Sequence, residues 1–193
     1  MSNPLRDRRT VADLAAVEQV IEIADKISSF EGLAAIVEAD LAALDPDKMP
    51  CGWRDSAVTG ELQFGFVDAA GSVPMLKGSA EAHVAAVCQR CLEPFELRLC
   101  IEPELLLLDT DEVAEGYEDL EVWELDERIV RPQDIVEELL IMAMPFSAVH
   151  DNMADCRAFS PAEPLVDEGA EKLLTPFAAL RSQMTQNEKD PTE

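Results

Sequence analysis

The sequence is poor in basic residues: 15 Lys and Arg stand against 40 Asp and Glu, which gives a formal net charge of −25 over 193 residues. A surface this negative repels phosphate at long range, so broad docking on bare RNA or DNA is not expected. The charge favours a basic protein partner, because complementary fields speed and orient the encounter. The alternative is that the charge serves solubility alone.

The chain also lacks any apolar run of about 18 residues, the minimum for a transmembrane helix, and it has only five cysteines. The arginines near its start have no apolar segment behind them, which is not the pattern of a secretory signal. An odd, small number of cysteines favours a reducing compartment. We therefore expect a cytoplasmic protein that makes no membrane contact.

Motifs of the common enzyme classes are missing: the sequence has no GxSxG, no P-loop and no GxGxxG. Carboxylates gather in residues 101–127, with twelve Asp or Glu and no Lys or Arg. This stretch has no DxDxDG spacing, so it is a poor calcium loop. We expect its part 109–119 to be a solvated loop, with docking of a basic protein as the functional alternative. The sequence predicts no enzyme.

The pattern of apolar residues predicts an α+β fold with an antiparallel β-sheet core at about 55–125 and helices before and after it. Helical spacing of apolar residues runs over 11–24 and 30–44, and Pro132 suits the first turn of a third helix at 132–144. Alternation of apolar and polar residues predicts strands at 58–67, 73–76, 78–87, 95–101 and 122–125.

Three regions are expected along the chain. Residues 1–12 are basic and polar and predict a mobile N-terminal arm or a first strand, and residues 13–158 are long enough for a single α+β domain. Residues 159–193 predict an acidic, Pro-rich linker, a short helix and a disordered tail. In that helix Phe177 and Leu180 are candidate partner-binding residues, although the segment could instead cap the core.

Two short pairs of soft donors stand out, namely Cys88 with Cys91 and His150 with Cys156. The first pair falls at the predicted tip of a hairpin, and the second in a polar loop after the third helix. Zn²⁺ prefers four tetrahedral N or S ligands, and Cys₃His is an ordinary structural set. The four residues therefore predict a zinc site. Reduced turn cysteines with a surface histidine, or a redox pair, are the alternatives, although no helix N-terminus lies nearby to lower a thiol pKa.

The other candidate residues have simpler interpretations. Cys51 and Cys100 stand alone and are expected in the core, and His83, inside a predicted strand, is expected to be structural. Arg90 lies between the two thiols of the first pair. It could contact an RNA phosphate or a partner carboxylate, or pair with a local acid such as Glu93.

Residues 88–95, which read CQRCLEPF, resemble the signature of the YceD family, the large ribosomal RNA subunit accumulation proteins. Later blocks are similar to the family in the same order: EVWELD at 121–126, IVEELLIMAMP at 135–145, His150 with Cys156, and PFAAL at 176–180. The resemblance spans about 58 to 181.

This resemblance implies a non-enzymatic factor in large ribosomal subunit biogenesis that supports 23S rRNA accumulation. Combined with the acidic composition, it predicts contact with a basic ribosomal protein of the large subunit or with a pre-ribosomal particle. Direct rRNA contact would be limited to a few cations: Arg6, Arg8, Arg9 and Arg90. One alternative is an RNA-processing enzyme or nuclease acting on the rRNA precursor, which would need clustered carboxylates holding Mg²⁺. Another is a zinc-binding or thiol redox module.

Overall fold

The computed structural model describes residues 3–67, 72–110, 112, 116–117, 119–125 and 128–156. These residues belong to the first of two compact units, Met1–Phe159; the second unit is Ser160–Glu193. Phe177 and Leu180 lie outside the described residues, as do the predicted linker, short helix and tail.

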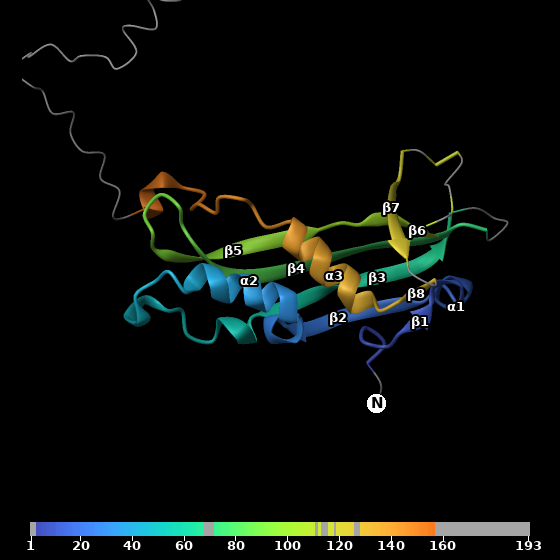
Figure 1. Ribbon diagram of the computed structural model, residues 1–193, viewed down its shortest axis with the longest axis horizontal. Helices are drawn as coiled ribbons and strands as arrows, with labels where there is room; N and C mark the ends of the chain where they lie inside the picture. Colours follow the sequence, from blue (N-terminus) through green and yellow to red (C-terminus); the bar gives the residue numbers. More distant parts are fainter. Residues whose placement is uncertain are drawn as a thin grey trace, which may run out of the picture. The chain divides into compact units, whose positions relative to one another are not determined.

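The core of the described part is a six-stranded sheet in the order β2-β3-β4-β6-β7, with β5 also paired to β4 (Figure 1). The pairs are antiparallel except β6 with β7, which is parallel. The long strand β4 organises the sheet, because β3 pairs along one edge while β5 and β6 share the other. The strands are β2 Val20–Lys26, β3 Ala57–Phe66, β4 Pro74–Val87, β5 Pro94–Ile101, β6 Glu104–Asp109 and β7 Glu121–Leu125.

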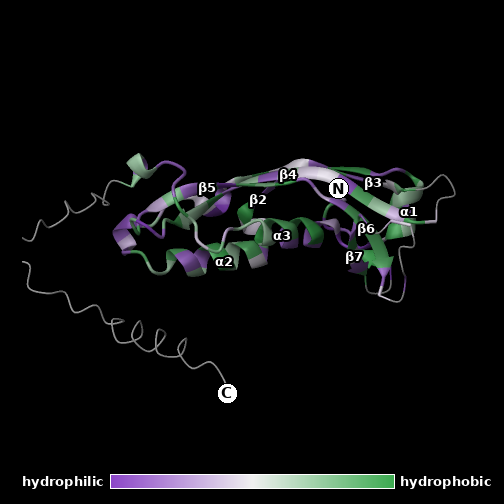
Figure 2. Ribbon diagram, turned by 90° about the horizontal axis from the view of Figure 1, so that it is seen from above, coloured by the Kyte–Doolittle hydropathy of each residue, from purple (hydrophilic) through white to green (hydrophobic). Residues whose placement is uncertain are grey.

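Two helices, α2 (Glu31–Leu41) and α3 (Pro132–Met142), lie on one face of this sheet (Figure 2). The buried residues of both helices share one hydrophobic core with buried strand residues such as Leu62 and Phe64. The N-cap residue of α2 supplies no side-chain hydrogen bond. Instead, the carboxylate of Glu137 in α3 accepts hydrogen bonds from the amides of Gly32 and Leu33, the latter at 3.1 Å. One helix therefore satisfies the free amides at the start of the other.

The α+β prediction is confirmed, and strands β3, β5 and β7 and helices α2 and α3 lie close to their predicted ranges. The predicted strands at 73–76 and 78–87 form one continuous strand, β4. Strand β6 was not predicted, because its leucines at 105–108 are all buried and show no alternation.

The predicted helix at 11–24 is wrong beyond its first turns. Helix α1 covers only Val11–Ala16, Glu18 takes a left-handed φ of 48°, and the chain then enters β2. Ile21 and Ile23 alternate with exposed residues and are buried against β3. Stiff β-branched side chains favour that pleated surface, so the sheet begins at residue 20 and not near 55.

Of the two interpretations of residues 1–12, a first strand is the one found. Strand β1 (Arg9–Thr10) pairs with β8 (Ile129–Val130). Leu5 is buried, and its carbonyl oxygen accepts a hydrogen bond of 2.9 Å from the amide of Gln133. None of the helices in the described ranges combines the length and the apolar character needed to cross a bilayer.

The backbones of β3 and β4 approach closely at Gly78. A Cβ atom there would lie 2.2 Å from the carbonyl oxygen of Glu61, whereas a Cβ on Gly65 would meet nothing within 4 Å. We expect Gly78→Ala to lower the free energy of unfolding by about 2 kcal/mol, because the strands must move apart. Gly65→Ala, the matched control in the neighbouring strand, should be neutral or slightly stabilising. Urea unfolding measures both; equal stability of the two variants would contradict the close approach.

Candidate metal centre

Strands β4 and β5 form a hairpin whose tip is a tight knuckle. The amide of Leu92 donates to the carbonyl of Cys88 at 2.8 Å, and the amide of Cys88 donates to the carbonyl of Glu93 at 3.0 Å. Leu92 takes a left-handed φ of 57°, a conformation that a leucine rarely adopts. The turn brings Cys88 and Cys91 to one place at the end of the sheet.

The segment 143–156 returns from the end of α3 to this knuckle. The amide of Gln89 donates to the carbonyl of Ala148 at 2.9 Å, which joins the two segments. A 3₁₀ turn, η4 (Met153–Asp155), follows, and the amide of Cys156 closes it by donating to the carbonyl of Met153. This path carries both His150 and Cys156 to the hairpin tip, which is the condition for a site shared by all four donors.

The four donor atoms lie within 4.8 Å of one another. The distance from Cys88 Sγ to Cys156 Sγ is 3.8 Å, and His150 Nδ1 lies 3.6 Å from Cys91 Sγ and 3.4 Å from Cys156 Sγ. Zinc with bonds of about 2.3 Å to sulfur and about 2.0 Å to nitrogen needs tetrahedral edges of about 3.8 Å between sulfurs and about 3.5 Å between sulfur and nitrogen. The three measured distances between donor atoms therefore fit a tetrahedral Zn²⁺ ion bound by three cysteines and one histidine.

Burial and hydrogen bonding give the thiols different proton affinities. Cys88 and Cys156 are buried, while Cys91 is half-buried. Burial raises the pKa of Cys88, but hydrogen bonds from the backbone of Cys91, His150 and Arg90 outweigh it and lower that pKa to about 5. Burial, together with hydrogen bonds to Cys88 and Cys91, raises the pKa of Cys156 to about 11. Two thiolates this close repel each other, and a divalent cation between them removes that repulsion.

Two neighbouring side chains hold His150 in place. The guanidinium of Arg90 donates a hydrogen bond to the His150 carbonyl, and Arg90 Nε is buried without a hydrogen-bond partner in the described part of the chain. The ring of Phe95 packs on the imidazole with 4.7 Å between centroids. Such supporting contacts orient ligands at metal sites. Sequence reasoning missed the role of Phe95, because nothing in the spacing of residues 95 and 150 signals that their rings meet.

Arg90 therefore points at the centre and not at Glu93. The carboxylate of Glu93 instead accepts a hydrogen bond from Lys48 at 2.5 Å, an ion pair formed across 45 positions in the chain. Arg6, one of the cations proposed for RNA contact, pairs with Asp25 at 2.5 Å.

The remaining cysteines lie elsewhere. Cys51 and Cys100 are exposed, so the expectation that they belong to the core is wrong. Cys100 alternates with buried residues in β5 and points outward, and Cys51 follows Pro50 in an exposed turn. His83 lies on the outer face of the sheet, 3.0 Å from a carboxylate oxygen of Glu81 and 3.0 Å from one of Glu96. Hydrogen bonds to both acids raise its pKa, which agrees with a structural role.

Comparison with known proteins adds one result. Neither the curated proteins nor the solved structures gave a match. The model of the family described as large ribosomal RNA subunit accumulation protein YceD matches residues 76–182, more than half of the 193. The matched segment contains the hairpin, helix α3 and all four donors of the candidate centre. The chain belongs to the YceD family.

Proposed function

We propose that this chain is a non-enzymatic factor in large ribosomal subunit biogenesis, which supports 23S rRNA accumulation by contact with a basic ribosomal protein. The family match across the hairpin, α3 and the donor cluster carries the proposal. The family description names the accumulation of large-subunit RNA, and the net charge of −25 supports the mode of contact.

The distribution of cations supports protein contact over RNA contact. Eight of the eleven Lys and Arg residues in the described ranges already pair with a carboxylate within 4 Å. Arg90 faces a backbone carbonyl in the candidate centre. This leaves Arg8 and Arg9 as the described cations without such a contact, too few for tight capture of a phosphate backbone.

We further propose that Cys88, Cys91, His150 and Cys156 hold Zn²⁺ in a structural role. Four protein ligands close a tetrahedral coordination sphere and leave no position for water or substrate, so the ion would serve structure and not catalysis. It would fasten the segment 143–156 to the hairpin tip. Within the described residues, this cluster is the one group of His, Cys, Asp and Glu arranged to bind a metal. That observation supports a non-enzymatic factor over a Mg²⁺-dependent nuclease, which needs clustered carboxylates.

The cellular role can be tested by gene deletion and complementation. We expect 23S rRNA to fall in the deletion strain and to recover with the wild-type gene, because assembly of the large subunit protects its RNA. In vitro, the purified protein should bind isolated basic ribosomal proteins of the large subunit at about 0.15 M salt and show no tight binding of protein-free 23S rRNA. Unchanged 23S rRNA in the deletion strain, or tight, salt-sensitive capture of the bare RNA, would contradict the proposal.

The metal can be tested by elemental analysis and thermal unfolding. We expect one zinc per chain, lost in Cys88→Ser and in Cys156→Ser, because each change removes a buried ligand. Both variants should melt roughly 10 °C lower, which corresponds to about 3–4 kcal/mol for a chain of this size. The exposed Cys51→Ser and Cys100→Ser are matched controls and should keep both metal and melting temperature. A metal-free wild type with a disulfide between Cys88 and Cys91 would favour the redox alternative.

A further inference from the structure

The sheet has a gap beside the second half of β4. The register of β3 with β4 ends at Val58 opposite Ala82, but β4 continues to Val87. Residues 83–87 pair with β5 on one side and with no described strand on the other. The chain before β3 does not form a strand here but two 3₁₀ turns, η2 (Pro46–Lys48) and η3 (Trp53–Asp55).

The direction of the backbone groups follows from the hydrogen bonds around them. The amide of Cys88 donates across the hairpin to Glu93, so amides at even positions of this stretch point toward β5. The amide of Val87 points to the opposite side, where it donates to the Asp40 carboxylate of α2 at 2.8 Å. The amide of Ala85 points to that side too, and no described strand lies opposite it. Unpaired groups at a strand edge are a template for another strand.

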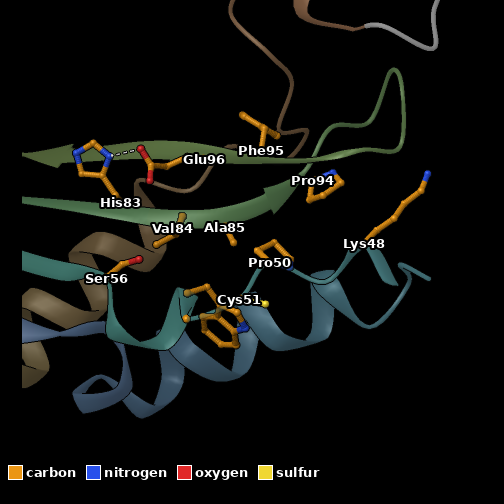
Figure 3. A pocket seen from close by; sticks show the side chains of 12 residues that line it. Lys48, Pro50, Cys51, Ser56, His83, Val84, Ala85, Pro94, Phe95 and Glu96 are labelled. Atoms are coloured by element: carbon orange, nitrogen blue, oxygen red, sulfur yellow. Dashed lines mark hydrogen bonds and ion pairs between the residues drawn. The ribbon is translucent and has the colours of Figure 1, made fainter. Parts of the chain in front are cut away.

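A cleft with a volume of about 350 Å³ lies at this edge (Figure 3). The segment 46–56, with Pro50 and Cys51, forms one wall, and the hairpin of β4 and β5 forms the other (Figure 3). Apolar residues line much of it: Pro50, Trp53, Val84, Ala85, Pro94 and Phe95. The size is at the lower end of the range for ligand sites, and it suits a few residues of extended chain.

The charges at the mouth of the cleft favour a cationic occupant. The side chain of Glu96 is 71% exposed, and its partner in the structure is His83, which also contacts Glu81. The stronger cations nearby are taken, because Lys48 pairs with Glu93 and Arg98 pairs with Glu81. His83 is thus the one cation that contacts Glu96 in the described part of the chain, and an arriving Lys or Arg could take its place on this exposed carboxylate. The net charge of −25 adds to the attraction of a basic chain.

We propose that the cleft binds an extended peptide segment that pairs its backbone with Ala85 and places a Lys or Arg side chain beside Glu96. The free strand edge supplies main-chain hydrogen bonds, and the apolar walls receive the side chains that alternate with the basic one. The inference rests on the proposed function, since the segment would belong to the basic protein partner. Phe95, a wall of the cleft, also packs on His150, so the candidate metal centre supports one side of this binding site.

The test begins with a phage-displayed library of random nine-residue peptides selected on the full-length protein. We expect enrichment of peptides in which Lys or Arg alternates with apolar residues. Absence of enrichment, or enrichment of acidic peptides, would overturn the proposal. A synthetic copy of the strongest peptide is then titrated calorimetrically, and its binding should shift the amide resonance of Ala85.

Variants locate the site. Cys51→Tyr should weaken the peptide at least tenfold, because a phenol ring from this exposed cleft residue fills the space. Met49→Tyr, two positions earlier and outside the lining of the cleft, is the matched control and should bind as the wild type does. Ala85→Pro removes the backbone N–H that points to the unpaired edge and leaves the hydrogen bonds between β4 and β5 in place. It should weaken peptide binding as much as Cys51→Tyr does. If Ala85→Pro fails to fold, the comparison of peptide affinity between Cys51→Tyr and Met49→Tyr is sufficient to test the site. Equal affinity in that pair would overturn the proposal.

The peptide-binding test can fail independently of the test of the proposed function. If Cys51→Tyr loses the peptide and also fails to restore 23S rRNA in the deletion strain, both proposals are supported. If the peptide binds in the cleft while deletion of the gene leaves 23S rRNA unchanged, the proposed function fails and the binding site stands. If deletion lowers 23S rRNA and no peptide is selected, the binding site falls and the proposed function stands.

Discussion

The contact between the tip of the β4–β5 hairpin and the segment 143–156 decides where the four candidate ligands lie. It gathers four donor atoms within 4.8 Å although up to 68 positions separate their residues. Segment 143–156 has few regular backbone hydrogen bonds of its own, and two of those it makes involve the 3₁₀ turn before Cys156. Its path is therefore set by the donor cluster, by the bond from Gln89 to Ala148 and by the guanidinium of Arg90. Ordering so short a segment costs conformational entropy, which four metal–ligand bonds can offset.

The parts of this arrangement that sequence could predict are those with a local signature. The alternation of apolar and polar residues predicted β3 and β5, and the spacing of Cys and His residues pointed to all four candidate ligands. Both patterns can be recognised from a few neighbouring residues. Contacts between distant segments have no such signature, and the packing of Phe95 on His150 and the pairing of Lys48 with Glu93 were not foreseen. The error over 11–24 has a different cause. Leu14, Val17 and Ile21 satisfy a helical period, and only pairing with β3 decides that Ile21 and Ile23 belong to a strand.

Most described Lys and Arg side chains have a carboxylate partner nearby, but the chain as a whole carries a large excess of negative charge. Most of the described cations are held by carboxylates at the surface, where each pair contributes little to stability. Their consequence for binding is larger, since a paired Lys or Arg must lose its partner before it can meet a phosphate. With 40 acidic against 15 basic residues, the sequence keeps an excess of carboxylates that attracts a cationic chain. The same 15 basic residues would allow more RNA contact if they were grouped on one face.

The unpaired edge of β4 is unusual because it is only partly protected. Proteins commonly cover or charge such edges to prevent association with other chains. Here Asp40 satisfies the amide of Val87, and the segment 46–56 stands over the rest without pairing to it. A cover of this kind excludes a long strand, which would collide with the segment, and still admits a short one. Together with the apolar walls and the carboxylate of Glu96, this cover would favour the proposed occupant, a few residues of extended, basic chain. Since Phe95 lines the cleft and packs on His150, a change at the candidate metal centre would also reach the wall of the proposed peptide site.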